Sequence, residues 1–272
     1  MELMKNITLG QFIPGDSLVH RLDPRVKIAL LFLIMVQIFA TDRLLPYGLL
    51  MVFILLAAVL AKLKLKFFIR GLKPILILIA ITFFFNAVFA GGRPLVSFWK
   101  FTLTAEGLHL GAAMSLRLIL LILSTSLLTL TTSPIQMTDA LESLLSPFRR
   151  VGLPAHELAM MTTIALRFIP LMLEETEKIM KAQMARGAEF ERGSLYRRAR
   201  SLIPILVPLF VHAFRHAEEL AVAMEARCYR GGEGRTRLKT LRVSSLDLWA
   251  CLWAGAILVL IATFHPPGGF FH

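Results

Sequence analysis

The chain has 272 residues, of which 56% are hydrophobic, and its formal net charge is +12. With a mean hydropathy of +0.69, this composition excludes an ordinary soluble domain and is typical of a helical integral membrane protein. A positive charge of this size would suggest nucleic acid as the partner of a soluble protein, but here most basic residues flank long apolar runs. Anionic lipid and membrane topology account for them, so no nucleic acid is expected as a partner.

Five long apolar runs predict five membrane-spanning helices. The first run is short for a hydrocarbon core that requires about 20 residues, and only residues 41–43 separate it from the second. The expected fold class is all-α: an integral membrane protein with about five transmembrane helices plus long amphipathic cytoplasmic coupling helices. The five runs are residues 26–40, 44–61, 72–90, 107–130 and 246–264.

The fourth run has two features that bear on helix packing. Gly107, Gly111 and Ser115 recur at a spacing of four, and small residues so spaced let membrane helices approach closely. Arg117 lies in the same run, where a charge is costly unless it is paired or faces a cavity. Two roles for Arg117 stay open: functional coupling, or a structural bond to a neighbouring helix.

The distribution of lysine and arginine predicts which connections face the cytoplasm. Residues 1–27 contain 4, residues 41–46 contain 1, residues 62–73 contain 5, residues 91–106 contain 2 and residues 131–245 contain 17. Because cytoplasmic loops carry the excess of positive charge, the N-terminus, the second loop and the long segment before the last span are expected inside a prokaryotic cell. The C-terminus is then expected outside the cell (inner) membrane.

The segment between the fourth and fifth spans divides the chain into three regions. Residues 1–130 form an N-terminal membrane region with four spans, residues 131–245 form a cytoplasmic or interfacial region, and residues 246–272 hold the last span and the tail. The middle region begins with Ser133 and Pro134, which are typical of a helix start and predict a short amphipathic helix.

Two longer helical units follow in this middle region. Residues 154–187 predict one helix whose first half is apolar and whose second half is charged. After a basic connection over residues 191–200 the plan repeats, with an apolar stretch at 202–214 and a charged stretch at 215–227. The candidate hinges and anchors of these helices are Pro170, Pro204, Pro208 and Arg167, the last either linking to the spans or reaching the headgroups.

One short pattern occurs at the end of both units, 41 residues apart. Residues 182–187 read Ala-Gln-Met-Ala-Arg-Gly, and residues 223–228 read Ala-Met-Glu-Ala-Arg-Cys. Gly187 after the first arginine is typical of the cap that ends a helix. Small residues permit close helix approach, and an arginine at a helix end can bind a carboxylate or carbonyl groups in a partner's groove. An isolated Arg186 or Arg227 would be expected only to complement the helix dipole, but the duplication favours a contact with a partner.

The chain resembles the transmembrane T component of energy-coupling factor (ECF) transporters, the CbiQ/EcfT family. Residues 15–25 resemble the family's lead-in to the first span, and residues 165–187 resemble its most recognisable stretch. The resemblance covers residues 10–265, and Cys228 stands where the second motif of the family usually has glycine. The two signature motifs are Ala185-Arg186-Gly187 and Ala226-Arg227-Cys228.

The resemblance implies a non-catalytic subunit of an ATP-driven importer. Arg186 and Arg227 would each dock in a groove of one of two cytoplasmic ABC-type ATPase subunits, which hydrolyse the ATP. A membrane-embedded S component would capture a vitamin or a transition-metal ion such as cobalt or nickel. Closing and opening of the ATPase pair would move the coupling helices, and the S component would topple and release its substrate inside. No cofactor or metal site is implied for this chain.

Two other classes of function are less well supported by the residues. A membrane-bound enzyme acting on a lipid-linked substrate would need acidic residues or histidines clustered at one membrane face. A channel or secondary carrier would need charged residues in several spans, whereas only Arg117 qualifies. His156 and the other histidines show no paired metal-ligand pattern, and Cys228 and Cys251 do not suggest a disulfide framework or a metal cluster.

Overall fold

The computed structural model describes residues 12–41, 44–91, 94–98, 101–152, 154–188, 190, 195–231 and 243–263. In chain order its elements are α2 (Leu18–Arg21), α3 (Pro24–Ala40), α4 (Leu44–Leu60), α5 (Leu65–Leu72), the 3₁₀ turn η1 (Lys73–Ile75), α6 (Leu76–Phe89), β1 (Pro94–Phe98), β2 (Phe101–Thr104), α7 (Ala105–Thr131), α8 (Pro134–Leu145), η2 (Ser146–Val151), α9 (Ala155–Ala185), α10 (Leu195–Ala226) and α11 (Ser245–Thr263).

The chain divides into two compact units. The first, here called the bundle unit, comprises residues 9–137 and 239–272. The second, here called the hairpin unit, contains residues 138–238 and is built around α9 and α10. The boundary falls inside α8, so this helix is the covalent link that leads from α7 into the hairpin unit.

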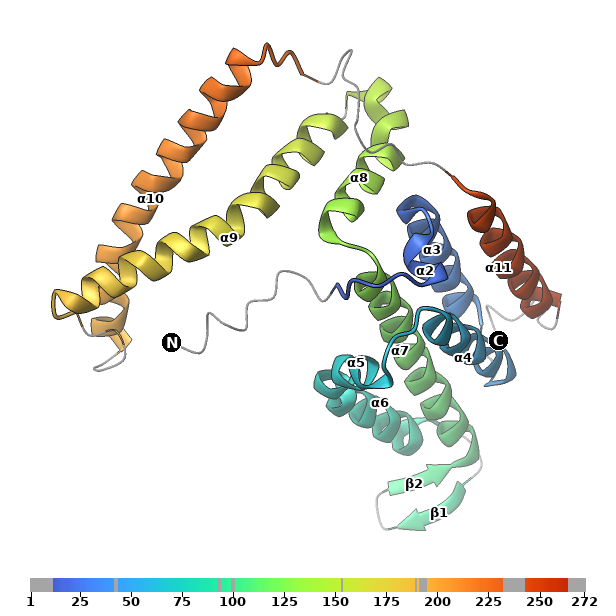
Figure 1. Cartoon of the computed structure of the whole chain (residues 1–272). Coiled ribbons are helices and arrows are strands. Elements are labelled where there is room, and N and C mark those ends of the chain that lie inside the picture. Colours follow the sequence, from blue (N-terminus) through green and yellow to red (C-terminus); the bar gives the residue numbers. More distant parts are fainter. Residues whose placement is uncertain are drawn as a thin grey trace. The chain divides into compact units, whose positions relative to one another are not determined.

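Helix α7 is the centre of the bundle unit and packs against α3, α4, α5 and α6 (Figure 1). Leu120 and Leu123 of α7 belong to one apolar core with Ile38 of α3 and Leu50 and Ile54 of α4. Helix α11 packs against α3 on the same unit. Because apolar burial dominates packing energy, this core fixes the arrangement of the helices around α7.

Large apolar side chains also cover the outside of the bundle unit. Val52 and Val59 of α4, Ile77 of α6 and Trp249 of α11 are each more than 60% exposed. Such a surface is unfavourable in water and suits lipid. By length and composition, helical segments 66–89, 105–131 and 155–185 could each cross a membrane, and shorter apolar helices cover 44–60 and 245–257.

The five predicted apolar runs correspond to α3, α4, α6, α7 and α11, which confirms the predicted all-α membrane fold class. The structure also explains why small residues recur every four positions in the fourth run. A Cβ atom at Gly107 would lie 2.7 Å from the Asn86 carbonyl oxygen, and one at Gly111 would lie 3.0 Å from the Phe83 carbonyl oxygen. Glycine therefore lets α7 touch the backbone of α6, and Ser115 is buried on α7.

Two connections contain elements that were not predicted. Residues 94–104, expected as a plain connection, contain the antiparallel strands β1 and β2, in which Val96 pairs with Leu103 and Phe98 with Phe101. The basic loop 62–73, also expected as a connection, contains the amphipathic helix α5. Strand β2 alternates apolar and polar residues, and α5 has the helical period of an amphipathic helix, whereas β1 carries no such alternation.

Candidate functional site

The two repeated units form an antiparallel helix pair. In Figure 1, α9 is yellow and α10 is orange, and residues near the end of α9 lie beside the first part of α10. The Gln183 side-chain amide donates a hydrogen bond to the Pro204 carbonyl oxygen at 3.4 Å. The rings of Phe168 and His216 lie 6.5 Å apart between centroids. The apolar half of each helix therefore lies beside the charged half of the other, an arrangement that was not predicted.

The two motifs end in the same backbone turn. The amide of Gly187 donates to the Met184 carbonyl at 3.0 Å, and the amide of Cys228 donates to the Glu225 carbonyl at 2.8 Å. One residue further on, the amide of Ala188 donates to the Gln183 carbonyl at 3.0 Å. Each position in the first motif corresponds to the position 41 residues later in the second. The bond that corresponds to this one runs from the Tyr229 backbone amide to the Met224 carbonyl, at 3.1 Å.

Both turns require a left-handed backbone conformation. Gly187 has φ of +87°, which confirms its predicted role as the cap at the end of a helix. Cys228 has φ of +57°, so the second motif keeps the same turn although a side chain makes this conformation unfavourable. The turn geometry is thus preserved where the sequence departs from glycine.

The structure exposes the residues of both motifs on the hairpin unit. Arg186 lies at the C-terminal end of α9 and Arg227 at the C-terminal end of α10, and both are exposed. Because the helices are antiparallel, the two arginines lie at opposite ends of the pair. The other members of the motifs, also exposed, are Ala185, Gly187, Ala226 and Cys228.

The charged half of α9 carries local ion pairs. The Lys178 ammonium donates to a Glu175 carboxylate oxygen at 2.8 Å, and this bond lowers the pKa of the half-buried Glu175 carboxyl. Lys181 pairs with Glu177 at 2.8 Å. Such pairs at spacings of three and four support a solvated helix face, which agrees with a polar environment for this half of the helix.

The proline residues lie inside continuous helices. Pro170 lies within α9, and Pro204 and Pro208 lie within α10. Since Pro208 has no N–H, it leaves the Pro204 carbonyl without its partner one turn ahead, and the Gln183 side chain supplies a donor instead. Arg167 is exposed on α9. The basic connection predicted over 191–200 is shorter than expected, because α10 already begins at Leu195.

The second motif is tied to the first turn of α9 by residues that sequence reasoning did not assign. The Tyr229 hydroxyl donates to the Met160 sulfur at 2.8 Å and lies 3.4 Å from His156 Nε2. His156 Nδ1 lies 2.9 Å from a Glu142 carboxylate oxygen on α8. His156 was considered only as a metal ligand. Within the described residues, no three of His, Cys, Asp and Glu gather where they could hold a metal ion.

Arg117 forms a structural bond inside the bundle unit. Its Nε donates to the Tyr47 hydroxyl at 3.0 Å, and its terminal nitrogen donates to the Thr41 carbonyl at 3.0 Å. The Tyr47 hydroxyl donates to the same Thr41 carbonyl, and the guanidinium lies over the Phe39 ring at 5.7 Å. Of the two roles left open by the sequence, the structure supports the structural one, because Arg117 joins α7 to the α3–α4 turn.

The N-terminal lead-in residues also have structural roles. Asp23 caps α3 by accepting from the Arg25 amide at 2.9 Å, and Ser17 caps α2. The Asp247 carboxylate at the start of α11 accepts from the Asp23 amide at 2.7 Å and from the Ser244 amide at 2.6 Å. This buried contact fastens α11 to the start of α3.

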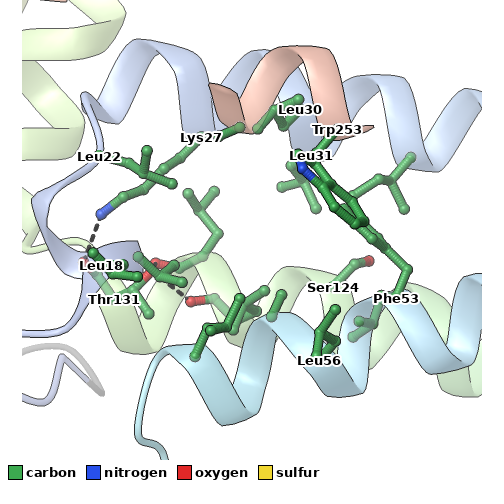
Figure 2. A pocket seen from close by; sticks show the side chains of 18 of the residues that line it. Leu18, Leu22, Lys27, Leu30, Leu31, Phe53, Leu56, Ser124, Thr131 and Trp253 are labelled. Atoms are coloured by element: carbon green, nitrogen blue, oxygen red, sulfur yellow. Dashed lines mark hydrogen bonds between the residues drawn. The ribbon is translucent and has the colours of Figure 1, made fainter. Parts of the chain in front are cut away.

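An apolar cavity of about 400 Å³ lies in the bundle unit between α2, α3, α4, α7 and α11 (Figure 2). Phe53, Leu56 and Trp253 line it, and Lys27 lies at one end. The Lys27 ammonium donates to the Thr131 carbonyl at 3.0 Å and to the His20 carbonyl at 3.2 Å. Because it binds backbone oxygens of His20 and Thr131, Lys27 joins the ends of α2 and α7.

Comparison with known proteins identifies the family. A family described as cobalt transport protein, CbiQ, matches residues 15–238. The chain is 57% identical to the energy-coupling factor transporter transmembrane protein EcfT of Thermosediminibacter oceani, over 94% of this chain and 97% of that protein. It is 54% identical to EcfT of Acidaminococcus fermentans and 52% identical to EcfT of Clostridium kluyveri, in each case over 96% of this chain and 97% of the relative. The chain therefore belongs to the CbiQ/EcfT family of ECF transporter transmembrane proteins.

Proposed function

We propose that this chain couples two cytoplasmic ABC-type ATPase subunits to a membrane-embedded S component, for uptake of a vitamin or a transition-metal ion. The observation that carries the proposal is the pair of matching arginine turns at opposite ends of one helix pair. In this account the chain itself is not catalytic, and ATP is hydrolysed on the separate subunits.

The geometry favours one ATPase subunit for each motif. Helix α9 has 31 residues, so the two arginine turns are separated by a helix length of about 45 Å. A single binding groove cannot hold both turns at this separation. Two subunits of one ATPase dimer, each with one groove, fit the twofold repetition of the motif. Residues 182–187 and 223–228 would enter these grooves as helix ends, with Arg186 and Arg227 binding acceptor groups at the bottom.

The apolar surface of the helix pair supports a contact within the membrane. On α10, Leu206, Val207, Phe210 and Phe214 are 46% to 73% exposed, and on α9 Met161 is 58% exposed. A patch of this kind marks a lipid or protein contact. We assign it to the S component and the surrounding lipid. Movement of the arginine ends would then shift this surface, with Arg167 as an anchor and Pro170, Pro204 and Pro208 as hinges.

The proposed topology has five spans and a helix pair at the cytoplasmic face of the membrane. The spans are α3, α4, the run 72–90 that contains α6, α7 and α11. In this topology the N-terminus is cytoplasmic, residues 131–245 lie in the cytoplasm or at its interface with the membrane, and the C-terminus is outside. The excess of lysine and arginine in the alternate connections supports this orientation. The three regions 1–130, 131–245 and 246–272 then correspond to the membrane scaffold, the coupling region and the last span.

Charge reversal at the two arginines tests the proposal. Losing a paired interface arginine typically costs about 2–5 kcal/mol, so Arg186→Glu or Arg227→Glu should weaken ATPase co-purification and the double change should abolish it. Arg215→Glu is the matched control, because Arg215 is exposed on α10 but lies 12 residues before the motif arginine. Full retention of both ATPase subunits by the double variant would refute the assigned contacts.

A further inference from the structure

The turn of the second motif continues into a chain of side-chain contacts. Tyr229 follows Arg227 by two residues, and its backbone amide closes the turn on the Met224 carbonyl. Its hydroxyl reaches Met160 and His156 on the first turns of α9. The residue that shapes the arginine turn is therefore the same residue that ties this turn to another helix.

His156 extends this connection to α8. A carboxylate can only accept a hydrogen bond, so the Nδ1 proton of His156 points to Glu142 at 2.9 Å, and Nε2 is left as an acceptor. Nε2 and the Met160 sulfur are then two acceptors that share the single proton of the Tyr229 hydroxyl. The side chains of His156 and Glu142 are 13% and 14% exposed. Shielding from water strengthens such contacts. Three helix ends, those of α8, α9 and α10, thus meet through Glu142, His156 and Tyr229.

The first motif is connected differently. The position equivalent to Tyr229 is Ala188, whose methyl group has no hydrogen-bonding atom. The neighbouring tie runs from Gln183 to the Pro204 carbonyl, between α9 and α10. The two arginine turns therefore have the same backbone but different attachments. Only the contacts described for the second reach α8, the helix that leads to α7 along the chain.

We propose that Glu142, His156 and Tyr229 are positioning residues that join the second arginine turn to α8. A displacement of Arg227 by an ATPase subunit then moves α8 together with the end of α10. Among the described contacts, a displacement of Arg186 acts through the α9–α10 pair. The two motifs would bind the ATPase subunits in the same way but would pass the resulting displacement to different helices. This inference rests on the proposed function, because it assigns Arg227 to an ATPase contact.

Distance measurements between two spin labels test the connection. Labels are placed at Leu141→Cys on α8 and Arg230→Cys after the motif, both exposed, in a Cys228→Gly and Cys251→Ser background. The complex with its ATPases and S component, held in nanodiscs, is measured without nucleotide and with ATP. We expect the same single distance between the two labels without nucleotide and with ATP. Tyr229→Phe should raise the population of a second, ATP-dependent separation roughly two- to tenfold, the range expected for one net hydrogen bond.

Three further variants complete the test. Glu142→Ala should give the same second separation, and combining it with Tyr229→Phe should add little because both act in one chain of contacts. Glu142→Gln keeps the acceptor and should restore the single separation. Tyr196→Phe, which removes a hydroxyl from a tyrosine 77% exposed on α10, should behave as the parent. All these variants should retain both ATPases.

The inference and the function on which it rests fail in different ways. If Tyr229→Phe gives the same distances as the parent, or if the parent already shows an ATP-dependent separation, the positioning chain is refuted. If Arg227→Glu retains both ATPase subunits, the proposed function is refuted as well. Loss of an ATPase in Arg227→Glu together with unchanged distances in Tyr229→Phe would overturn the positioning chain alone.

Discussion

The left-handed turn at Cys228 gives a prediction about the strength of the second motif. A side chain in this conformation costs roughly 1–2 kcal/mol, whereas glycine pays about 0.5–1 kcal/mol in lost chain entropy. With φ of +57° at Cys228, Cys228→Gly should therefore stabilise the closed turn by up to about 1 kcal/mol, or about fivefold in its population. Cys228→Val should destabilise it by a similar or larger amount, because β-branched residues strongly disfavour positive φ.

Hydrogen exchange of the backbone amides measures this effect directly. The amides of Cys228 and Tyr229 close the turn, and those of Gly187 and Ala188 in the other motif serve as internal references. Exchange at residues 228 and 229 should slow in Cys228→Gly and accelerate in Cys228→Val, while the references stay constant. Equal exchange in all three proteins, or slower exchange with valine than with glycine, would refute the reasoning about the turn.

Three predictions concern the bundle unit and are checked by thermal unfolding of the purified protein in detergent. Gly107→Ala places a methyl group against the Asn86 carbonyl and should destabilise the α6–α7 contact by about 1–3 kcal/mol, whereas Gly255→Ala, which meets nothing within 4 Å, should have little effect. Arg117→Met should cost about 1.5–3 kcal/mol through lost charged hydrogen bonds to Tyr47 and Thr41, and an unchanged melting temperature would contradict its structural role. Asp247→Ala should leave the buried Asp23 amide without its acceptor and cost about 1–3 kcal/mol, with faster exchange at that amide; normal protection there would exclude the proposed link from α11 to α3.

Local sequence patterns predicted the features that depend on one helix at a time. The spacing of Gly107 and Gly111 predicted a close helix contact, and Gly187 predicted a helix end. Both predictions were possible because glycine best fits the space or the backbone conformation at that position. The antiparallel pairing of α9 and α10 was not predictable in the same way. A duplicated motif indicates that two helices end in the same turn. Their relative direction depends on side-chain contacts between them, such as those of Gln183 and Phe168.

Residues whose partners are distant in sequence were the ones assigned incompletely. His156 lies 14 residues from Glu142 and 73 residues from Tyr229, and no periodic pattern marks such a set. Arg117 could be recognised as a costly charge, yet its partners lie 70 and 76 residues away. The exposed motif residues show the opposite case. Their duplication identifies them in the sequence, whereas the partners expected for them belong to other chains.

Site-specific cross-linking measures the central claim most directly. Ala185→Cys and Ala226→Cys, each beside a motif arginine, are labelled with a thiol-linked photo-cross-linker in the Cys228→Gly and Cys251→Ser background and irradiated in the assembled complex. The account predicts one ATPase subunit attached through each label and, in the doubly labelled chain, a product containing one copy of this chain and two ATPase subunits. A label at Arg215→Cys should give much less product. Absence of the product with two ATPases, or equal cross-linking from position 215, would contradict the account.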